Sequence, residues 1–451
     1  MNLQEFQKEL LNKGETYGFS DMEIYYEKAE NFASDIYKGE IDSYSTSVEM
    51  GLSFRGLYNG NMGYAYTEKL DEDSIDFLLN SAKENAGIME EDTPEEIFSG
   101  SSFYEEGNFY SARLKETSVE EKLDFLKELD RCIYEADPRV DSTDYFTMQV
   151  QEKERALFNN KGLSLQEKLN DLILYVSVVV KENGITKTGE KLVFSKDMRE
   201  LDPAKIAKEA VEEAVSYLKA VSIPNKKYPI VLRNTAAASL FGTFASIFSA
   251  EEAQKGMSQL KNKVGESIAS SILDVVDDPF LKTGVFSRTF DGEGVASKPL
   301  NLIEKGKLTS LLHNRKTAQK EGMESTGHAY KDSYKGALTV APSNLYITPS
   351  QTSYEDLVSS IEEGVVITGL SGLHSGANAV SGDFSVAAYG YRIVDGEIKS
   401  AVNQMTIAGN FFDLLKDIEE VGSDLDFAFS VSPGYIGSPS LKVKKLSVTV
   451  E

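Results

Sequence analysis

Histidine and cysteine, the side chains that most often bind zinc in hydrolases, are scarce in this sequence. It contains three histidines, His313, His328 and His374, and a single cysteine, Cys132. A catalytic zinc site takes three protein ligands, and two of them are usually histidines one helical turn apart. These histidines are separated by much more than one turn. The sequence therefore argues against a zinc site, a disulfide framework and an iron–sulfur cluster built within this chain.

Serine and carboxylate groups offer two further kinds of chemistry, but neither forms a specific motif. Ser-x-x-Lys occurs at Ser216–Lys219 and Ser258–Lys261 without the other motifs of such enzymes, and a Gly-x-Ser-x-Gly elbow is missing. Asp274, Asp277 and Asp278 are residue types that bind Mg²⁺ or Ca²⁺. A strand that ends in an Asp-Asp-Pro turn is the simpler explanation of the three aspartates.

Two segments rich in glycine, serine and aromatic residues are the remaining candidates for a binding site. They are Ser325–Ser350 and Ser371–Ile398. Glycine permits close approach of another backbone, and an exposed strand edge beside such segments would bind an extended peptide by β-augmentation. Tight turns in a β-rich domain would give the same composition, so both interpretations stay open.

The composition excludes several classes of protein. The 451 residues include 72 acidic and 47 basic side chains, for a net charge of −25, which argues against direct contact with nucleic-acid phosphates. The longest apolar run, Leu172–Val180, is far shorter than the roughly 20 residues of a membrane helix. Charged residues interrupt the apolar pattern near the N-terminus, unlike in a signal peptide. We therefore expect a cytoplasmic protein without a membrane span.

Two stretches of the N-terminal half share one order of predicted elements. In each, strands separated by turns precede an amphipathic helix, and the turn glycines Gly39 and Gly162 occupy matching places. A shared order at a constant offset is typical of internal duplication. We predict two antiparallel sheet-plus-helix repeats, at about 20–88 and 142–220.

A helix and a proline-rich segment divide the chain further. A helix over 118–136 is predicted to join the two repeats, and two prolines interrupt the pattern within Ser222–Pro229. We therefore predict an N-terminal α+β domain, 1–222, and a β-rich C-terminal domain, 223–451, with one long helix over 235–255. Strands and helices do not alternate regularly, which favours the α+β class over a doubly wound sheet.

Three motifs in the C-terminal half resemble the TldD/PmbA family, and specifically its PmbA (TldE) branch, whose members have been labelled modulators of DNA gyrase. They are STGHAY at Ser325–Tyr330, SGDFSVAAYGY at Ser381–Tyr391 and TIAGN at Thr406–Asn410. The likeness extends over nearly the whole chain. It implies a heterodimer in which a TldD-type subunit is a zinc metallopeptidase acting on unfolded or flexible peptides, including peptide-antibiotic precursors and an antitoxin.

The resemblance also indicates where the family's zinc site would lie, and those positions lack ligands here. The TldD branch carries His-Glu-x-x-x-His on the long helix, and a count back from the following Lys-Gly-Met-Ser stretch places Phe241, Gly242 and Ser246 there. The third ligand is a cysteine, and Leu425 stands at or near its place. Phenylalanine cannot bind zinc, glycine cannot act as a base, and serine is a poor ligand. We therefore expect no catalytic residue and no metal in this chain, with zinc in a TldD-type partner.

The two glycine- and serine-rich segments are then expected to face a cavity between subunits, where they would bind substrate backbone or support the partner's active site. The candidate groove residues are Ser325, Thr326, Gly327, His328, Asn344, Tyr346, Asn378, Ser381 and Asp383. Turns that only shape the fold remain an equal explanation for each of them.

Three functional hypotheses follow. The leading one is a non-catalytic subunit of a TldD/TldE-type metallopeptidase complex that degrades or matures unfolded peptides, paired with a TldD-like subunit or with a second copy. The alternative is a regulatory protein that binds peptides or gyrase without a proteolytic role. The least favoured is an independent homodimeric hydrolase using serine or carboxylate chemistry.

Overall fold

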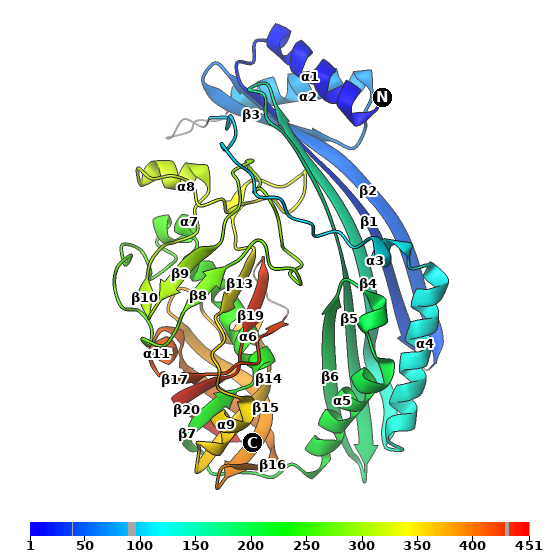
Figure 1. The fold of residues 1–451 in the computed structure, drawn as a ribbon, viewed down its shortest axis with the longest axis vertical. Helices are drawn as coiled ribbons and strands as arrows, with labels where there is room; N and C mark the ends of the chain where they lie inside the picture. The colour runs from blue at the N-terminus through cyan, green and yellow to red at the C-terminus, as the bar shows by residue number, and fades with distance from the viewer. Residues whose placement is uncertain (38, 89–95, 429–432, 451) are drawn as a thin grey trace.

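A long, curved antiparallel sheet forms the N-terminal half of the protein (Figure 1). The computed structural model describes residues 1–37, 39–88, 96–428 and 433–450. The six strands of this sheet lie in the order β3-β2-β1-β4-β5-β6. Their bounds are β1 Met22–Tyr37, β2 Glu40–Tyr58, β3 Asn61–Thr67, β4 Val140–Asn159, β5 Ser164–Glu182 and β6 Ile185–Ser195.

The strand order reveals two copies of one unit, related by an approximate two-fold axis. Strands β1 and β4, the first of each copy, pair antiparallel at the centre of the sheet. The hairpin turns match as well: Asn59 and Gly60 both have positive φ, and so do Asn183 and Gly184, as a two-residue turn between twisted strands requires. The predicted duplication of an antiparallel sheet-plus-helix unit is confirmed.

Helices cover one face of this sheet, in two groups (Figure 1). One core cluster joins α1 and α2 to the strands around Ile24 and Phe54, and another joins α4 and α5 to the strands around Phe32 and Val176. Local caps start these helices, including a capping box between Ser118 and Glu121. The helical bounds are α1 Leu3–Tyr17, α2 Glu72–Ala86, α3 Ala112–Glu116, α4 Val119–Ala136, η1 Met198–Glu200, α5 Pro203–Ser216 and η2 Tyr217–Lys219.

Two further six-stranded sheets form the C-terminal half. Their orders are β10-β9-β8-β13-β19-β18 and β16-β15-β14-β7-β20-β17, and β11 and β12 form a small separate pair. The strand bounds are β7 Lys226–Leu232, β8 Val275–Asp277, β9 Leu300–Glu304, β10 Lys307–Leu308, β11 Ala329–Tyr330, β12 Thr339–Val340, β13 Asn344–Ile347, β14 Glu363–Ser371, β15 Asp383–Val394, β16 Glu397–Asn410, β17 Ile418–Val421, β18 Asp426–Ala428, β19 Tyr435–Ser438 and β20 Leu441–Val450.

Helix α6, Asn234–Thr243, contacts strands of both sheets, namely β18 and β19 of one and β14 of the other. It therefore lies in the largest apolar core of the protein. The other C-terminal helices are short: η3 Ala245–Phe248, α7 Ala250–Gln254, α8 Arg315–Lys320, α9 Tyr354–Ser359, α10 Leu373–Gly376 and α11 Phe411–Lys416. The α+β class with a β-rich C-terminal half is confirmed, and the described helices include none long and apolar enough to cross a membrane.

The single long helix expected over 235–255 is divided in the structure into α6, η3 and α7. Ser249 has an extended backbone and caps α7. Leu312 donates its N–H to the Phe248 carbonyl at 2.8 Å and accepts from the Ala250 N–H at 3.0 Å. A tertiary backbone pairing thus replaces helical hydrogen bonds at this point, which explains why periodicity alone did not predict the break.

Two glycines let a helix lie directly on a strand, one in each copy of the repeat. A Cβ added to Gly63 of β3 would stand 1.9 Å from the Ala82 carbonyl oxygen of α2, and one added to Gly189 of β6 would stand 2.3 Å from the Ala210 oxygen of α5. Neither contact can be relieved by turning a side chain, because the obstructing atom belongs to a helix backbone.

We predict that Gly63→Ala and Gly189→Ala each lower the free energy of unfolding by about 1–3 kcal/mol, since the helix must move off the sheet. Gly336→Ala is the matched control, because its added Cβ would meet its nearest neighbour at 3.5 Å. Urea unfolding followed by circular dichroism measures all three. Wild-type stability in the first two variants would contradict this account of the packing.

Candidate functional site

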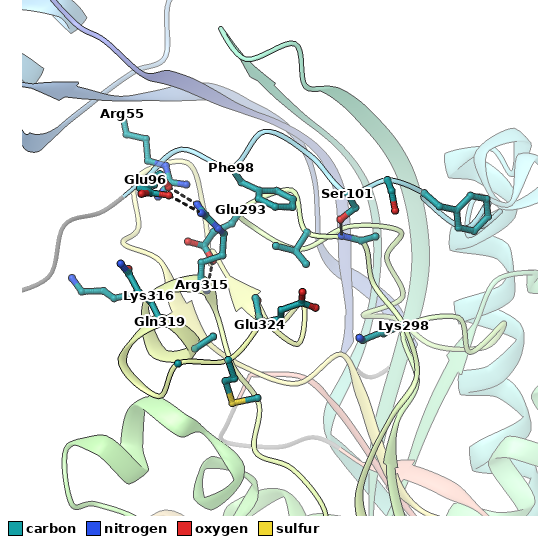
Figure 2. A pocket seen from close by; sticks show the side chains of 18 residues that line it. Arg55, Glu96, Phe98, Ser101, Glu293, Lys298, Arg315, Lys316, Gln319 and Glu324 are labelled. Atoms are coloured by element: carbon teal, nitrogen blue, oxygen red, sulfur yellow. Dashed lines mark hydrogen bonds and ion pairs between the residues drawn. The ribbon is translucent and has the colours of Figure 1, made fainter.

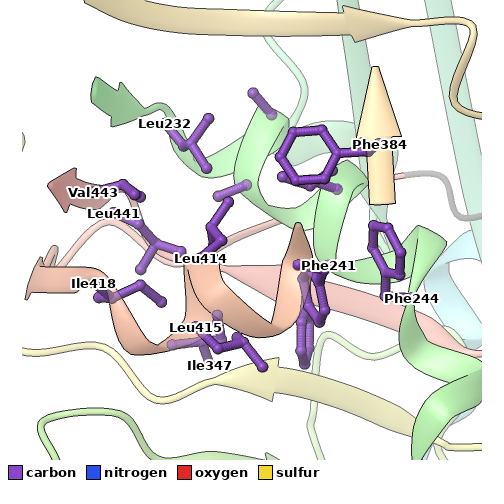
Figure 3. Close-up of a cluster of buried hydrophobic side chains, with 14 of the residues drawn as sticks. Leu232, Phe241, Phe244, Ile347, Phe384, Leu414, Leu415, Ile418, Leu441 and Val443 are labelled. Atoms are coloured by element: carbon purple, nitrogen blue, oxygen red, sulfur yellow. The ribbon is translucent and has the colours of Figure 1, made fainter. Parts of the chain in front are cut away.

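Phenylalanine rings occupy the helix α6 region to which the sequence assigns the family's zinc ligands. Phe241 is 2% exposed, and its ring centroid lies 6.1 Å from that of Phe248 and 6.3 Å from that of Phe411. Phe244 stacks on Phe411 at 4.3 Å and meets Phe384 edge-on at 6.4 Å. Figure 3 shows Phe241 and Phe244 within a layer of leucine, isoleucine and valine side chains.

The residues at the other expected positions do not supply the imidazole, thiolate or carboxylate ligands that a zinc ion requires. Gly242 has no side chain, and Ser246, which is half-buried in η3, offers one hydroxyl. Leu425 follows Asp424, whose carbonyl accepts from the Asn234 side chain at 2.8 Å. Asn234 is the first residue of α6, so this contact lies about 10 Å along the helix axis from Phe241. Across the described ranges, His, Cys, Asp and Glu side chains do not converge in groups of three or more that could hold a metal ion.

A buried hydrogen-bonded network connects His328 to strand β8. The His328 Nε2 lies 2.9 Å from Asp277 Oδ2, and its Nδ1 lies 2.8 Å from Thr326 Oγ1. Asp277 also accepts from the Ser343 N–H at 2.7 Å and from the Ser343 hydroxyl at 2.5 Å. The Thr326 hydroxyl accepts in turn from the His313 N–H at 2.7 Å. His328 and Thr326 are therefore engaged within the fold.

Burial is the largest influence on Asp277 and would by itself raise the pKa of this carboxyl. The hydrogen bond and charge of His328, with help from Arg288 and Ser343, outweigh burial and hold the pKa of Asp277 below its usual value. The carboxylate is fully buried, and it is stabilised in its charged form by these neighbours. This arrangement fixes the backbone between β8 and the STGHAY motif.

The candidate groove residues after His328 lie in two separate places. Asn344 is fully buried, and its amide donates to the Asp278 carbonyl at 2.7 Å, whereas Tyr346 is half-buried beside Phe427. The group from the SGDF motif lies at the start of β15. It comprises Asn378, Ser381 and Asp383.

In the SGDF group, the side chains hold a turn. The Asn378 amide oxygen accepts from the N–H groups of Val380 at 2.9 Å and Ser381 at 3.2 Å. Asp383 is exposed and accepts from the Asn410 amide at 2.9 Å. The residue after it is Phe384, which packs on Phe244 of the phenylalanine cluster. This turn therefore flanks the α6 region.

A cavity of about 810 Å³ lies between the N-terminal sheet and the C-terminal half. Figure 2 shows charged side chains at one end of it, from both halves of the chain. The Arg315 N–H donates to Glu293 at 2.8 Å, and its guanidinium lies 3.7 Å from Glu96. Arg55 of β2, which forms an ion pair of 2.7 Å with Glu23, also lines the cavity. Of the predicted groove residues, Ser325 lies in its wall; Gly327, at a φ of +79°, lies buried behind it.

Two buried side chains between the N-terminal sheet and the C-terminal half, Glu293 and Lys331, have strongly shifted pKa values. Burial, with the neighbouring Asp291 carboxylate, raises the pKa of Glu293 to about 7. Burial, with Arg55 nearby, lowers the pKa of Lys331 to about 7, and its ammonium nitrogen lies 2.8 Å from the Ser53 hydroxyl. Sequence reasoning missed these residues. Arg55 alone carried a signal, as the one charged residue between Gly51 and Tyr58 of β2.

Three family models match almost the whole chain. They are described as PmbA/TldA metallopeptidase domain 1, central domain and C-terminal domain, and they match residues 22–86, 112–218 and 225–450. The chain belongs to the TldD/PmbA family. The descriptions of the three models characterise the family as metallopeptidase-like.

Relatives within the TldD/PmbA family are similar over most of their length. The chain is 29% identical to an uncharacterized protein of Methanocaldococcus jannaschii, with 91% of this chain and 93% of that protein covered. It is 26% identical to the metalloprotease PmbA of Escherichia coli O157:H7, with 73% and 70% covered. The second name is that of a metalloprotease, whereas Phe241, Gly242 and Ser246 of this chain do not fit a metal ion.

Solved structures of the TldD/PmbA family share the fold. A protein of Thermotoga maritima described as a candidate modulator of a DNA gyrase superimposes with a TM-score of 0.92 at 30% identity, over 99% of this chain and all of the other. TldE from Thermococcus kodakarensis superimposes with a TM-score of 0.89 at 24% identity, over 98% and 100%. At 24% identity, the similarity to TldE supports a shared fold only.

We predict that Phe244→Ala lowers the free energy of unfolding by about 3–5 kcal/mol, because it removes a ring stacked within the core. Phe77→Ala is the matched control on an exposed helix position, since Phe77 is 56% exposed. Chemical unfolding followed by circular dichroism compares the two. Equal small losses would mean that the α6 region is not a packed core.

We predict that Asp277→Asn lowers the free energy of unfolding by about 3–5 kcal/mol near neutral pH, because the buried network around His328 loses its charged carboxylate. The folded-state pKa of Asp277 is depressed, so its contribution is present above the unfolded value of about 3.9 and is lost as pH falls through the folded value. The stability gap between wild type and variant should therefore narrow below about pH 4. Unfolding curves from pH 3 to pH 7 measure this gap, and exposed Asp395→Asn serves as the control. A gap that widened on acidification would contradict the assignment.

Proposed function

We propose that this protein is a non-catalytic subunit of a TldD/TldE-type metallopeptidase complex that degrades or matures unfolded peptides. The observation that carries the proposal is the identity of the side chains at the expected zinc positions in α6 and η3. Phe241 is packed among other phenylalanines, Gly242 has no side chain, and Ser246 has only a hydroxyl. A zinc peptidase needs ligands and a general base, and these residues supply neither.

The proposal assigns the chemistry to a partner and the shaping of the site to this chain. A zinc ion held by a TldD-like subunit would polarise the peptide carbonyl and activate a water molecule. This chain would then position substrate backbone, for which small and hydroxyl side chains beside strand ends are suited.

Burial separates the nine candidate groove residues into two groups under this proposal. Thr326, Gly327, His328 and Asn344 are buried, and the side chains of Thr326, His328 and Asn344 form hydrogen bonds within the fold. These four residues would act by holding the backbone in place. The residues that keep exposed surface, and that we propose for substrate contact, are Ser325, Tyr346, Asn378, Ser381 and Asp383.

A gyrase-associated regulatory role is the second candidate, supported by the description of the Thermotoga maritima relative. The net charge of −25 means that such a role would depend on contact with protein rather than with DNA. The two candidates differ in the partner that they require.

We predict that the purified chain binds no stoichiometric zinc and leaves an unstructured substrate such as casein intact. Adding a TldD-like subunit with an intact His-Glu-x-x-x-His motif should produce zinc-dependent cleavage that a chelator abolishes. Metal analysis and a peptide-release assay measure the two properties.

Two controls locate the active site. The partner carrying glutamine in place of its motif glutamate should form the complex without cleavage, and Ser246→Ala in this chain should leave the activity of the complex unchanged. Chelator-sensitive cleavage by this chain alone would overturn the proposal. Recovery of gyrase without any TldD-like protein in an affinity purification would favour the second candidate.

A further inference from the structure

Glu293 places a buried carboxyl group in the wall of the cavity between the two halves of the chain. Its side chain is 5% exposed. One carboxylate oxygen, Oε2, accepts from the Arg315 N–H at 2.8 Å. Within the part of the chain that the structure describes, Glu293 forms no ion pair, and no hydrogen bond reaches its Oε1. One oxygen of this buried group is therefore left for a ligand in the cavity.

A second buried carboxylate, Asp291, adds negative charge beside Glu293. The oxygens of Asp291 accept from the N–H groups of Glu293, Val295 and Ala329, each at 2.9 Å. Backbone N–H groups satisfy these oxygens but carry no net charge. Burial and the Asp291 carboxylate together raise the pKa of Glu293 to about 7. The two carboxylates thus form a site that a cation would neutralise.

The two arginines near Glu293 are engaged with other groups. Arg55 forms an ion pair of 2.7 Å with Glu23, and both side chains are buried. The Arg315 guanidinium lies 5.1 Å from the centre of the Phe98 ring and 3.7 Å from Glu96. Both arginines lower the pKa of Glu293, but burial and Asp291 outweigh them. Neither arginine therefore acts as the direct counter-ion of Glu293.

The geometry of the site favours an ammonium ion over a metal ion. Ca²⁺ and Mg²⁺ need several oxygen ligands, whereas the Asp291 oxygens are already occupied by N–H groups. The described ranges hold no group of three acidic, histidine or cysteine side chains that could bind a metal. A primary ammonium group has three N–H donors. It can give one to Glu293 Oε1 and the others to water in a cavity of about 810 Å³.

We propose that this cavity binds a primary ammonium group, from the N-terminus of a short peptide or from a small amine, as the ion-pair partner of Glu293. The net charge of −25 raises the concentration of cations around the protein. Lys298 is exposed and lies toward the other end of the cavity in Figure 2, where it would pair with the carboxylate of a peptide. The inference involves neither zinc nor a partner subunit, so it does not rest on the proposed function.

The absence of tryptophan from the sequence gives a direct binding assay, because all tryptophan fluorescence then comes from the probe. The tripeptide Gly-Gly-Trp should bind to the full chain. The same tripeptide with an acetylated N-terminus should bind at least roughly tenfold more weakly, because acetylation removes the charge. Propylamine as a competitor distinguishes the two sources of the ammonium group. Displacement at similar concentrations assigns the site to amines in general, and displacement by peptides alone assigns it to peptide termini.

The pH dependence of binding gives a second readout. Affinity for Gly-Gly-Trp should fall below about pH 7, where Glu293 is protonated, and above about pH 8, where the α-amino group loses its proton. Propylamine stays charged to a higher pH and should show only the fall on the acid side. The charged groups around Glu293 that belong to this profile are Asp291 of its own turn, Arg315 and Lys316 of α8, Arg55 of β2, and Glu96 and Glu324.

Glu293→Gln removes the charge and keeps an oxygen that can accept from the Arg315 N–H. This variant should bind Gly-Gly-Trp at least roughly tenfold more weakly and lose the fall in affinity near pH 7, while its binding of the acetylated tripeptide stays unchanged. Glu304→Gln is the matched control, since Glu304 is exposed on β9 outside the cavity. Circular dichroism should show both variants folded.

Equal affinity of the wild type for the free and the acetylated tripeptide would overturn the proposal. Unchanged affinity in Glu293→Gln, or no binding of either amine at about 10 mM, would do so too. The acetylation and pH comparisons use the wild type, so they decide the matter even where Glu293→Gln fails to fold. None of these results bears on the zinc and peptidase measurements, so the two proposals fail separately.

Discussion

The antiparallel pairing of β1 with β4 is the constraint on which the rest of the structure depends. It runs from Glu23 opposite Asn159 to Asp35 opposite Thr147 and makes one sheet of two repeats. Because side chains alternate between faces, a slip of one residue would exchange the helix-covered face and the face toward the C-terminal half. The register therefore decides at once where the helices pack and where the interdomain cavity forms.

The junction between the halves combines backbone hydrogen bonds with buried charge. The Thr289 N–H and hydroxyl both donate to Glu167 of β5 at 2.8 Å, and the Arg155 side chain of β4 donates to the Phe290 carbonyl. Tyr104, which lies between α2 and α3, donates to the Gly294 carbonyl at 2.7 Å. Through these contacts the N-terminal sheet holds the backbone on either side of Glu293 in place, and so places Glu293 at the cavity.

Much of the fold was predicted from local features of the sequence. Features that depend on tertiary contacts were predicted much less well. Ser118 and the pair Asp202–Pro203 act as helix starts because capping depends on a few neighbouring residues. The break at Ser249 depends on backbone pairing with Leu312, far along the chain, which no local pattern contains. The family resemblance indicated the α6 positions. The charged cavity, in contrast, is lined by residues from β2 to α8, and their proximity follows only from the three-dimensional structure.

The phenylalanine packing around α6 also constrains how this lineage can change. A histidine at Phe241 would bury an imidazole among aromatic rings without a hydrogen-bond partner, at a cost of about 1–3 kcal/mol, and would gain nothing until further ligands arose. Such a substitution would thus lower the stability of the fold before any metal could be bound. The aromatic core around α6 therefore opposes the gain of a metal site at this place in the chain.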